Sequence, residues 1–194
     1  MPRPMLHLAS SSPRRRELLA TFGFDFTVEG VDLEERRLEG EAPPDMVLRL
    51  ATAKACAARE GGQRLVLGAD TAVVLDDRVF GKPADGGDAV AMLTALSGRR
   101  HQVLSGVALR AGAAVTTALS VTDVVFRDIR PDEARQYWQS GEPADKAGAY
   151  AIQGLGGVFV ASIEGSYSGV VGLPIFETAE LLRGAGLDVF GTTV

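Results

Sequence analysis

Apolar and polar residues follow two spacings along this chain, one typical of strands and the other of helices. Strands are predicted at residues 5–9, 24–28, 65–67, 72–75, 79–80, 101–126 (as two long paired strands), 158–160 and 167–171. Helices are predicted at residues 14–22, from 43, 85–96, 131–140 and from 172. Strands and helices are interleaved, and no Pro-, Ser- or charge-rich linker separates two compositions. The pattern therefore predicts an α/β fold with one domain over residues 1–194, or two lobes that share a sheet.

The stretch from Leu65 to Pro83 combines hydrophobic and chemical signals. A short buried strand begins at Leu65, and Asp70 stands where that strand is expected to end. Charged turn residues at 76–78 then predict a hairpin, and Lys82 follows within its return. A carboxylate between two buried runs is costly unless a cation, a metal or a hydrogen-bond donor meets it. Either Asp70 belongs to a charged site, or it caps a loop.

The first predicted helix begins with the wrong charge. Ser12 is a good N-cap and Pro13 suits the first turn, but Arg14, Arg15 and Arg16 follow at the positive end of the helix dipole. Backbone N–H groups, serine hydroxyls and guanidinium groups at a helix start can together bind phosphate oxygens. The alternative is that the arginines extend into water.

The helix that begins at Pro43 carries a lysine on its apolar stripe. Met46, Val47 and Leu50 recur at helical spacing, and Lys54 falls four residues after Leu50. Its stem can cover the apolar face while the ammonium stays in water, which is the commoner arrangement. Otherwise the ammonium reaches an anion.

A second stretch of polar residues, 141–157, carries five glycines. It is predicted to present side chains to a ligand from loops and strand edges, namely Asp145, Lys146, Tyr150 and Gln153. Glycine-rich loops are often only connectors, so this stretch alone is weak evidence of a site. His7 and His101 lie on predicted strands without metal-ligand spacing, and we expect them to be packing or edge residues rather than catalytic ones.

Composition narrows the class of protein. A chain that is 46% hydrophobic and 23% charged is typical of an ordinary globular protein. Its net charge of −5 argues against coating nucleic acid. Cys56 is the only cysteine, which excludes an intramolecular disulfide and a thiolate metal cage. The apolar runs are too short for a signal peptide or a membrane span. We therefore expect a cytoplasmic protein with no membrane partner.

Charged residues recur at element ends or on otherwise apolar faces. They are the cations Arg14, Arg15, Lys54, Lys82 and Lys146 and the acids Glu35 and Asp70. This set outlines a polyphosphate site, because carboxylates without histidine or cysteine suit a hard divalent ion that bridges phosphate oxygens. An acid beside such an ion can activate water for attack at phosphorus. The sequence contains no Walker pattern, so a P-loop kinase or ATPase is disfavoured.

Six motifs resemble those of the Maf family of nucleotide pyrophosphatases in the family's order. They are LASSSPRRRELL, LEERR, LGADTAVVLDDRVFGKP, LSGRRHQVLSGVAL, GEPADKAGAYAIQG and VVGLP, and the match spans residues 5 to 183. The resemblance implies an elongated mixed sheet flanked by helices, with two lobes around a deep cleft as in inosine-triphosphate pyrophosphatases, and a homodimer. It also implies hydrolysis of a nucleoside triphosphate to the monophosphate and pyrophosphate, with Mg²⁺ or Mn²⁺.

The resemblance also assigns roles to residues. Asp70 matches the family's general base, and Lys54 and Lys82 match lysines expected to contact phosphate. Glu35 matches the acid at the metal, with Asp70 as the second metal-side acid, although the adjacent Glu34 leaves that position open by one residue. Further substrate-binding residues implied by the match are Ser10, Arg14, Arg15, Thr71, Lys146 and Gln153.

Within the family, three positions separate two branches. Arg14, Thr71 and Gln153 resemble the branch that acts on dTTP and UTP, and this resemblance also implies modified pyrimidine triphosphates as substrates. The 7-methyl-GTP branch carries tryptophan, glutamine and glutamate at these positions. A glutamine offers one donor and one acceptor, as a uracil edge requires, whereas a carboxylate suits methylguanine better. A different class also stays open: a nucleotide-binding regulator of septum formation without essential catalysis.

Overall fold

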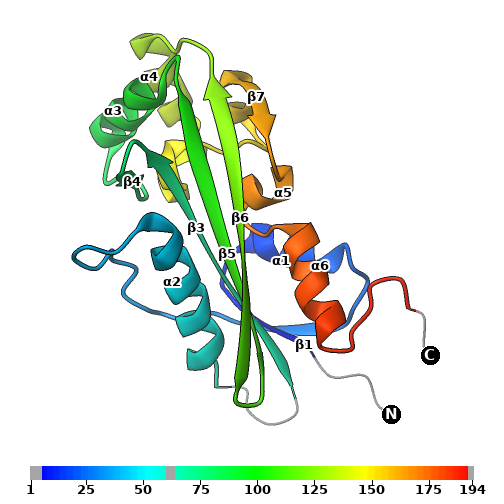
Figure 1. Cartoon of the computed structure of the whole chain (residues 1–194). Coiled ribbons are helices and arrows are strands. Elements are labelled where there is room, and N and C mark those ends of the chain that lie inside the picture. The colour runs from blue at the N-terminus through cyan, green and yellow to red at the C-terminus, as the bar shows by residue number, and fades with distance from the viewer. Residues whose placement is uncertain (1–5, 60–63, 192–194) are drawn as a thin grey trace. The chain divides into compact units, whose positions relative to one another are not determined.

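The computed structural model describes residues 6–59 and 64–191. Its strands are β1 (Leu6–Ala9), β2 (Phe26–Glu29), β3 (Leu65–Leu75), β4 (Arg78–Phe80), β5 (Arg100–Ala111), β6 (Ala114–Phe126) and β7 (Val160–Glu164). Its α-helices are α1 (Pro13–Ala20), α2 (Pro43–Ala57), α3 (Gly86–Leu96), α4 (Pro131–Gln139), α5 (Tyr167–Val171) and α6 (Ile175–Gly184). Three short 3₁₀ helices lie between α4 and β7: η1 (Glu142–Asp145), η2 (Ala147–Ala149) and η3 (Leu155–Phe159). Figure 1 labels most of these elements and colours the chain from blue at the N-terminus to red at the C-terminus.

The strands form one mixed sheet in the order β2-β1-β3-β5-β6-β7, and β4 pairs with β3. β1 pairs in parallel with both β2 and β3. The β3–β4 and β6–β7 pairs are antiparallel. This arrangement confirms the predicted α/β class with a mixed sheet flanked by helices.

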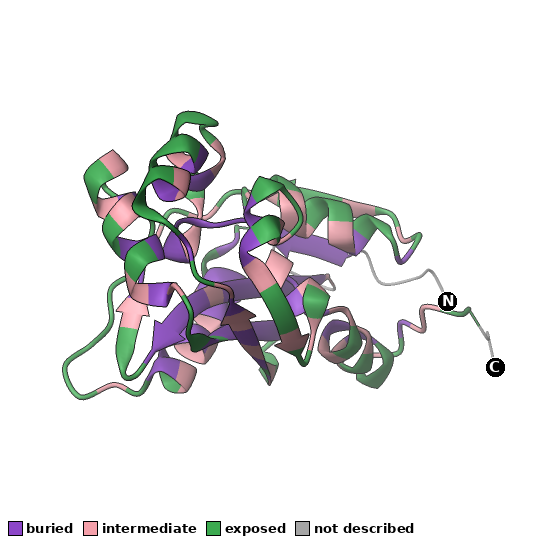
Figure 2. Ribbon diagram, turned by 90° about the horizontal axis from the view of Figure 1, so that it is seen from above, coloured by how far each residue is buried: buried purple, intermediate pink, exposed green. Residues whose placement is uncertain are grey.

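The chain divides into two compact units, and β3, β5 and β6 each pass from one unit into the other. Unit 1 comprises residues 1–70, 105–120 and 172–194, and unit 2 comprises residues 71–104 and 121–171. Each unit has its own buried apolar cluster, centred on leucines such as Leu8 and Leu182 in unit 1 and on aromatic residues such as Phe126 and Phe159 in unit 2. Figure 2 shows that buried residues concentrate on the strands.

In unit 1, α2 packs very closely on the sheet because two strands carry glycine beneath it. A Cβ atom on Gly68 of β3 would overlap the carbonyl oxygen of Ala51. A Cβ atom on Gly106 of β5 would lie 2.7 Å from the carbonyl oxygen of Val47. Real Cβ atoms do not approach backbone this closely, so glycine at both positions sets the distance from α2 to the sheet.

Ser12 is the N-cap of α1, as predicted. The helix predicted at 85–96 is α3, which begins one residue later because Asp85 is its N-cap. The prediction that a strand ends at Asp70 was wrong, because β3 continues without interruption to Leu75. The first half of β3 pairs with β1 and the second half with β4, so the strand has a partner along both halves.

Two apolar runs near the C-terminus were also assigned wrongly. Residues 158–160 were predicted as a strand, but η3 occupies most of this run and β7 begins only at Val160. Residues 167–171 form the helix α5, which begins where the Ser166 hydroxyl accepts a hydrogen bond from the backbone N–H of Gly169 (3.0 Å). A serine cap therefore overrides the β-propensity of a short valine-containing run.

Within the described ranges, no helix is both long enough and apolar enough to cross a membrane.

Candidate functional site

The centre of the candidate site is a buried lysine held between two carboxylates in unit 1. The Lys54 side chain comes from α2, and its Nζ atom lies 2.7 Å from Oδ1 of Asp70 on β3. The same Nζ atom lies 2.5 Å from Oε1 of Glu35, which lies in the segment between β2 and α2. Lys54 and Asp70 are 5% and 6% exposed. Three parts of the chain thus bring one cation and two acids together.

This geometry decides two alternatives that the sequence left open. The commoner arrangement for Lys54, with its ammonium in water, is wrong, because the ammonium is buried against Asp70. Asp70 is not a loop cap, because it lies inside β3. The helical spacing also predicts Ala57 on the apolar stripe of α2, but Ala57 is exposed and Ala55 is buried instead.

Burial makes Asp70 hold its proton more tightly than an ordinary aspartate. Desolvation raises the pKa of this carboxyl, while the charge and hydrogen bond of Lys54 and the charge of Arg15 lower it. Glu35 raises the pKa further by repulsion between the two acids. A carboxylate with a raised pKa next to a cation is suited to accept a proton from water.

The turn before α1 is organised by serine hydroxyls. Ser12 caps the helix by accepting from the backbone N–H of Arg15. The Ser10 hydroxyl accepts from the backbone N–H of Ser12 (3.2 Å) and from Nη1 of Arg15 (3.4 Å). The Nε atom of Arg15 donates to the carbonyl oxygen of Gly172 (2.8 Å). Arg15 is therefore fixed by main chain from a distant part of the sequence.

Arg15 also belongs electrostatically to the Lys54 group. Burial lowers the pKa of Arg15, Asp70 and Glu35 raise it, and Arg14 lowers it. A guanidinium stays charged in proteins, so its burial near two carboxylates adds a second cation to the group. The structure therefore brings together Ser10, Arg15, Glu35, Lys54 and Asp70 within unit 1, and Arg14 is adjacent to Arg15 in the same helix. The neighbouring Glu34 instead pairs with Arg36, at 3.4 Å.

The other predicted site residues belong to unit 2. Thr71 is half-buried on β3, and Lys82 is exposed after β4. Lys146 donates from Nζ to the carbonyl oxygen of Glu142 (3.2 Å) and pairs with the Asp145 carboxylate. Gln153 is exposed just before η3. Its side chain is thus accessible to a ligand, as the sequence predicts.

The structure contradicts the prediction for Tyr150. The sequence placed it among residues free to meet a ligand, but it is 5% exposed. Its ring packs edge-on against His101 and Phe126, and its hydroxyl lies 3.0 Å from Nε2 of His101. Tyr150 and His101 are therefore core residues of unit 2. His7 likewise has a packing role, with Nδ1 2.7 Å from the Thr27 hydroxyl.

Sequence reasoning missed Tyr137 and Glu142, which contact the backbone around Gln153. The available signal was the pair Gly154 and Gly156, because isolated glycines beside a polar residue often mark a close approach of another group. The sequence alone does not indicate which group approaches these glycines.

The acids of unit 1 fit a particular kind of metal site. Over residues 6–59 and 64–191, no group of three or more His, Cys, Asp or Glu side chains is arranged to hold a metal ion. Glu35 and Asp70 supply two hard oxygen ligands. Mg²⁺ in nucleotide enzymes is typically held by one or two carboxylates together with substrate phosphates and water. The pair therefore fits an ion that binds with a phosphate-bearing ligand.

Comparison with known proteins gives a family match and close relatives. The family model described as "Maf-like protein" matches residues 5–185. A relative from Methylococcus capsulatus, named dTTP/UTP pyrophosphatase, is 55% identical over 94% of this chain and 91% of its own length. A relative of the same name from Saccharophagus degradans is 54% identical over 91% of this chain and 87% of its own length.

Among solved structures, the Staphylococcus aureus Ham1 protein covers 63% of this chain and 71% of its own, with a TM-score of 0.45 and 13% sequence identity. A likeness at this level carries no functional argument. The family match and the relatives confirm the resemblance inferred from the six motifs.

Proposed function

The chain belongs to the Maf-like protein family, and on that premise we propose that it is a nucleoside triphosphate pyrophosphatase acting on dTTP and UTP. The products are the nucleoside monophosphate and pyrophosphate. The substrate class comes from the names of relatives that are 50–55% identical to this chain. The structural observation that supports it most directly is the buried ion pair of Lys54 and Asp70, with Glu35 in contact with the same ammonium.

We assign the proton transfer to Asp70. A water oxygen attacks phosphorus, its proton passes to the Asp70 carboxylate, and the anhydride bond between the α- and β-phosphates breaks. The raised pKa of Asp70 favours this transfer, and Lys54 at 2.7 Å favours the ionised carboxylate against the effect of burial. Pyrophosphate leaves with the electron pair of the broken bond.

The cations stabilise the negative charge of the phosphates. Arg14, Arg15 and the Ser10 turn are assigned to the triphosphate, as are Lys82 and Lys146, because fixed cations and N–H donors stabilise charge on phosphoryl oxygens. Glu35 and Asp70 would hold a divalent cation, Mg²⁺ or Mn²⁺, which when bound would offset phosphate charge.

Base selection is assigned to Gln153, with Thr71 and Arg14 completing the set of branch-specific residues. The Gln153 amide has one donor group and one acceptor, which match the polar edge of uracil or thymine. Modified pyrimidine triphosphates that keep this edge fit the same assignment.

The test is pyrophosphate release from a panel of triphosphates. With Mg²⁺ present, purified protein should release pyrophosphate from UTP and dTTP faster than from ATP, GTP or 7-methyl-GTP, and EDTA should abolish release. Preference for 7-methyl-GTP would assign the protein to the other branch. Binding of nucleotide without release would instead support the regulatory class.

Two variants test the assigned roles in the same assay. Asp70→Asn should abolish turnover while UTP still binds, and a variant with the wild-type rate would remove Asp70 from the proton transfer. Gln153→Glu should reduce the rate with UTP and dTTP relative to the other triphosphates. An unchanged ranking of the triphosphates would contradict the assignment of Gln153.

A further inference from the structure

The Glu142 carboxylate, at the start of η1, binds the backbone on the far side of Gln153. Its Oε2 atom accepts a hydrogen bond from the backbone N–H of Leu155 (2.9 Å), and its Oε1 atom accepts one from the backbone N–H of Gly156 (3.0 Å). Oε1 also accepts from the hydroxyl of Tyr137 on α4 (2.5 Å). One carboxylate thus joins α4 to the two residues that begin η3.

Tyr137 binds the near side of the same turn. Its hydroxyl oxygen accepts a hydrogen bond from the backbone N–H of Ala151 (3.0 Å). The backbone N–H of Gly154 donates to the carbonyl oxygen of Ala151 (3.2 Å), which closes the turn around Gln153. The backbone is therefore held on both sides of Gln153, while its side chain remains exposed.

Glycine makes these contacts possible. A Cβ atom on Gly154 would overlap the Glu142 carboxylate, and a Cβ atom on Gly156 would lie 2.5 Å from the Tyr137 hydroxyl. The turn lies directly against the two polar groups, with no room for a side chain between them. Such close contact leaves the backbone little freedom to move without breaking a hydrogen bond.

We propose that Glu142 and Tyr137 are positioning residues for base selection: they hold the turn 151–156 so that the Gln153 amide meets the pyrimidine edge. This inference rests on the proposed function, because it gives Gln153 the role of reading the base. Neither positioning residue is required to touch the substrate.

The charge state of the pair suits this role. Burial opposes ionisation of Glu142, but hydrogen bonds from Tyr137, Gly156 and Leu155 outweigh it and hold the pKa of this carboxyl below its usual value. Burial and the hydrogen bond to Glu142 raise the pKa of Tyr137. Near neutral pH the pair is therefore a carboxylate that accepts and a hydroxyl that donates, and hydrogen bonds to a charged acceptor are the stronger kind.

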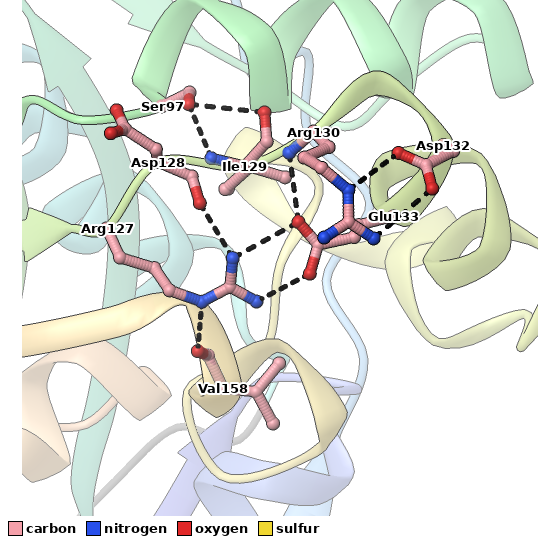
Figure 3. Close-up of polar contacts among 8 residues, drawn as sticks. All are labelled: Ser97, Arg127, Asp128, Ile129, Arg130, Asp132, Glu133 and Val158. Carbon is pink, nitrogen blue, oxygen red and sulfur yellow. Dashed lines mark hydrogen bonds and ion pairs between the residues drawn. The ribbon is translucent and has the colours of Figure 1, made fainter.

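A similar carboxylate on α4 serves as a matched control. Glu133 accepts from both terminal nitrogens of Arg127 (2.9 and 3.2 Å) and from the backbone N–H of Arg130 (2.9 Å), as Figure 3 shows. Arg127 in turn donates to the carbonyl oxygen of Val158 (3.0 Å), beyond the Gln153 turn. Glu133→Gln therefore removes comparable hydrogen bonds without a direct contact to residues 151–156.

The experiment compares Glu142→Gln, Tyr137→Phe, Gln153→Ala and Glu133→Gln, each shown to be folded at the assay temperature by circular dichroism. For each, kcat/KM is measured with UTP and with GTP. Glu142→Gln and Tyr137→Phe should each lower the UTP to GTP ratio by about tenfold, the loss expected when a polar recognition group is misplaced. Glu133→Gln should keep the wild-type ratio.

A double variant separates positioning from general damage. If Glu142 acts through Gln153, adding Glu142→Gln to Gln153→Ala should lower the ratio no further, whereas independent effects would multiply. Amide hydrogen exchange should rise at residues 151–156 in Glu142→Gln and stay unchanged there in Glu133→Gln.

The outcomes distinguish failure of the proposed function from failure of the positioning role of Glu142 and Tyr137. Wild-type protein that releases no pyrophosphate, or shows no preference for UTP, would overturn the proposed function and this inference with it. If folded Glu142→Gln and Tyr137→Phe both keep the wild-type UTP to GTP ratio, this inference is overturned and the proposed function is not. If Glu142→Gln does not fold, the Tyr137→Phe ratio and its exchange at residues 151–156 decide the question.

Discussion

At the scale of single residues, Lys54 shows how a buried charge depends on its partners. Its ammonium lies 2.7 Å from Asp70 and 2.5 Å from Glu35, and Lys54 and Asp70 are both buried. A buried ion pair adds little net stability compared with apolar packing, but removal of one partner leaves an uncompensated charge. The group is therefore costly to alter one residue at a time.

We predict that Lys54→Met lowers the free energy of unfolding by about 3 kcal/mol at pH 7, because Asp70 then remains buried without its main cation. Chemical denaturation measures the change. Adding Asp70→Asn should recover part of the loss, since it removes the unpaired charge. Lys82→Met is the matched control at an exposed lysine, where we expect a change within about 0.5 kcal/mol. Equal losses in the two single variants would contradict this reading of Lys54.

His101 is a second residue whose surroundings set its charge. It is 2% exposed, and Nδ1 has no hydrogen-bond partner among the described residues. Burial lowers the pKa of His101 from 6.5 to about 4, and Asp123 opposes the shift. The folded protein therefore binds fewer protons than the unfolded chain between these two values.

We predict that His101 makes the fold less stable as the pH falls. Its contribution is fully present above pH 6.5 and is lost as the pH falls toward about 4, by an amount on the order of 3 kcal/mol. Denaturation curves of wild-type protein and His101→Phe at pH 7.5 and pH 5 test this. The free energy of unfolding should fall less between pH 7.5 and pH 5 in the variant than in the wild-type protein. An equal fall in both proteins would show that His101 does not cause the loss of stability.

At the scale of elements, the packing of α2 on the sheet is set by Gly68 and Gly106. Alanine at either position would push the α2 backbone outward. The same displacement would move Lys54 away from Asp70, because Lys54 projects from that helix.

We predict that Gly68→Ala lowers the free energy of unfolding by about 2–4 kcal/mol, since its Cβ overlaps helix backbone that has no rotamer to change. It should also reduce pyrophosphate release by displacing Lys54. Gly81→Ala is the control, because a Cβ there meets nothing within 4 Å. Thermal denaturation and the pyrophosphate assay provide the two readings. Gly68→Ala behaving like Gly81→Ala would disprove the packing argument.

Elements with strong local signals were predictable from the sequence. Ser12 before Pro13 fixed the start of α1, and proline with acids in the first turn fixed α4. The wrong predictions concern segments whose secondary structure depends on contacts with other parts of the chain. Residues 167–171 have strand-like composition but no sheet neighbour, and a serine cap makes them helical.

The same distinction applies to the site. Residue types predicted a group of cations and acids, and the structure places five of the predicted residues, Ser10, Arg15, Glu35, Lys54 and Asp70, together in unit 1. Which ones pair could not be predicted, because the contact between Lys54 and Asp70 joins a helix to a strand. The sequence did not predict roles for Glu142 and Tyr137, because both accept hydrogen bonds from backbone N–H groups. Every residue other than proline has such a group, so residue types do not indicate which one is the donor.

At the scale of the whole molecule, two compact units share three long strands. Each unit has its own core, yet β3, β5 and β6 each belong to both. A strand that loses its order in one unit interrupts the hydrogen-bond ladder that continues in the other. The single domain over residues 1–194 and the homodimer stay predictions.

We predict one cooperative unfolding transition. Trp138, the only tryptophan in the sequence, lies in unit 2, whereas far-ultraviolet circular dichroism reports on both units. Denaturation midpoints from tryptophan fluorescence and from circular dichroism should therefore coincide. Separate midpoints would show that the units unfold independently and that the chain is two domains.

The two glycines beneath α2 also allow an inference about related chains. A related chain with a larger residue at either position would have to carry its helix farther from the sheet, and a lysine of fixed length would then fall short of the aspartate. Glycine at both positions in the sequence of a related chain therefore indicates that its helix can lie close enough to the sheet for the lysine to contact the aspartate.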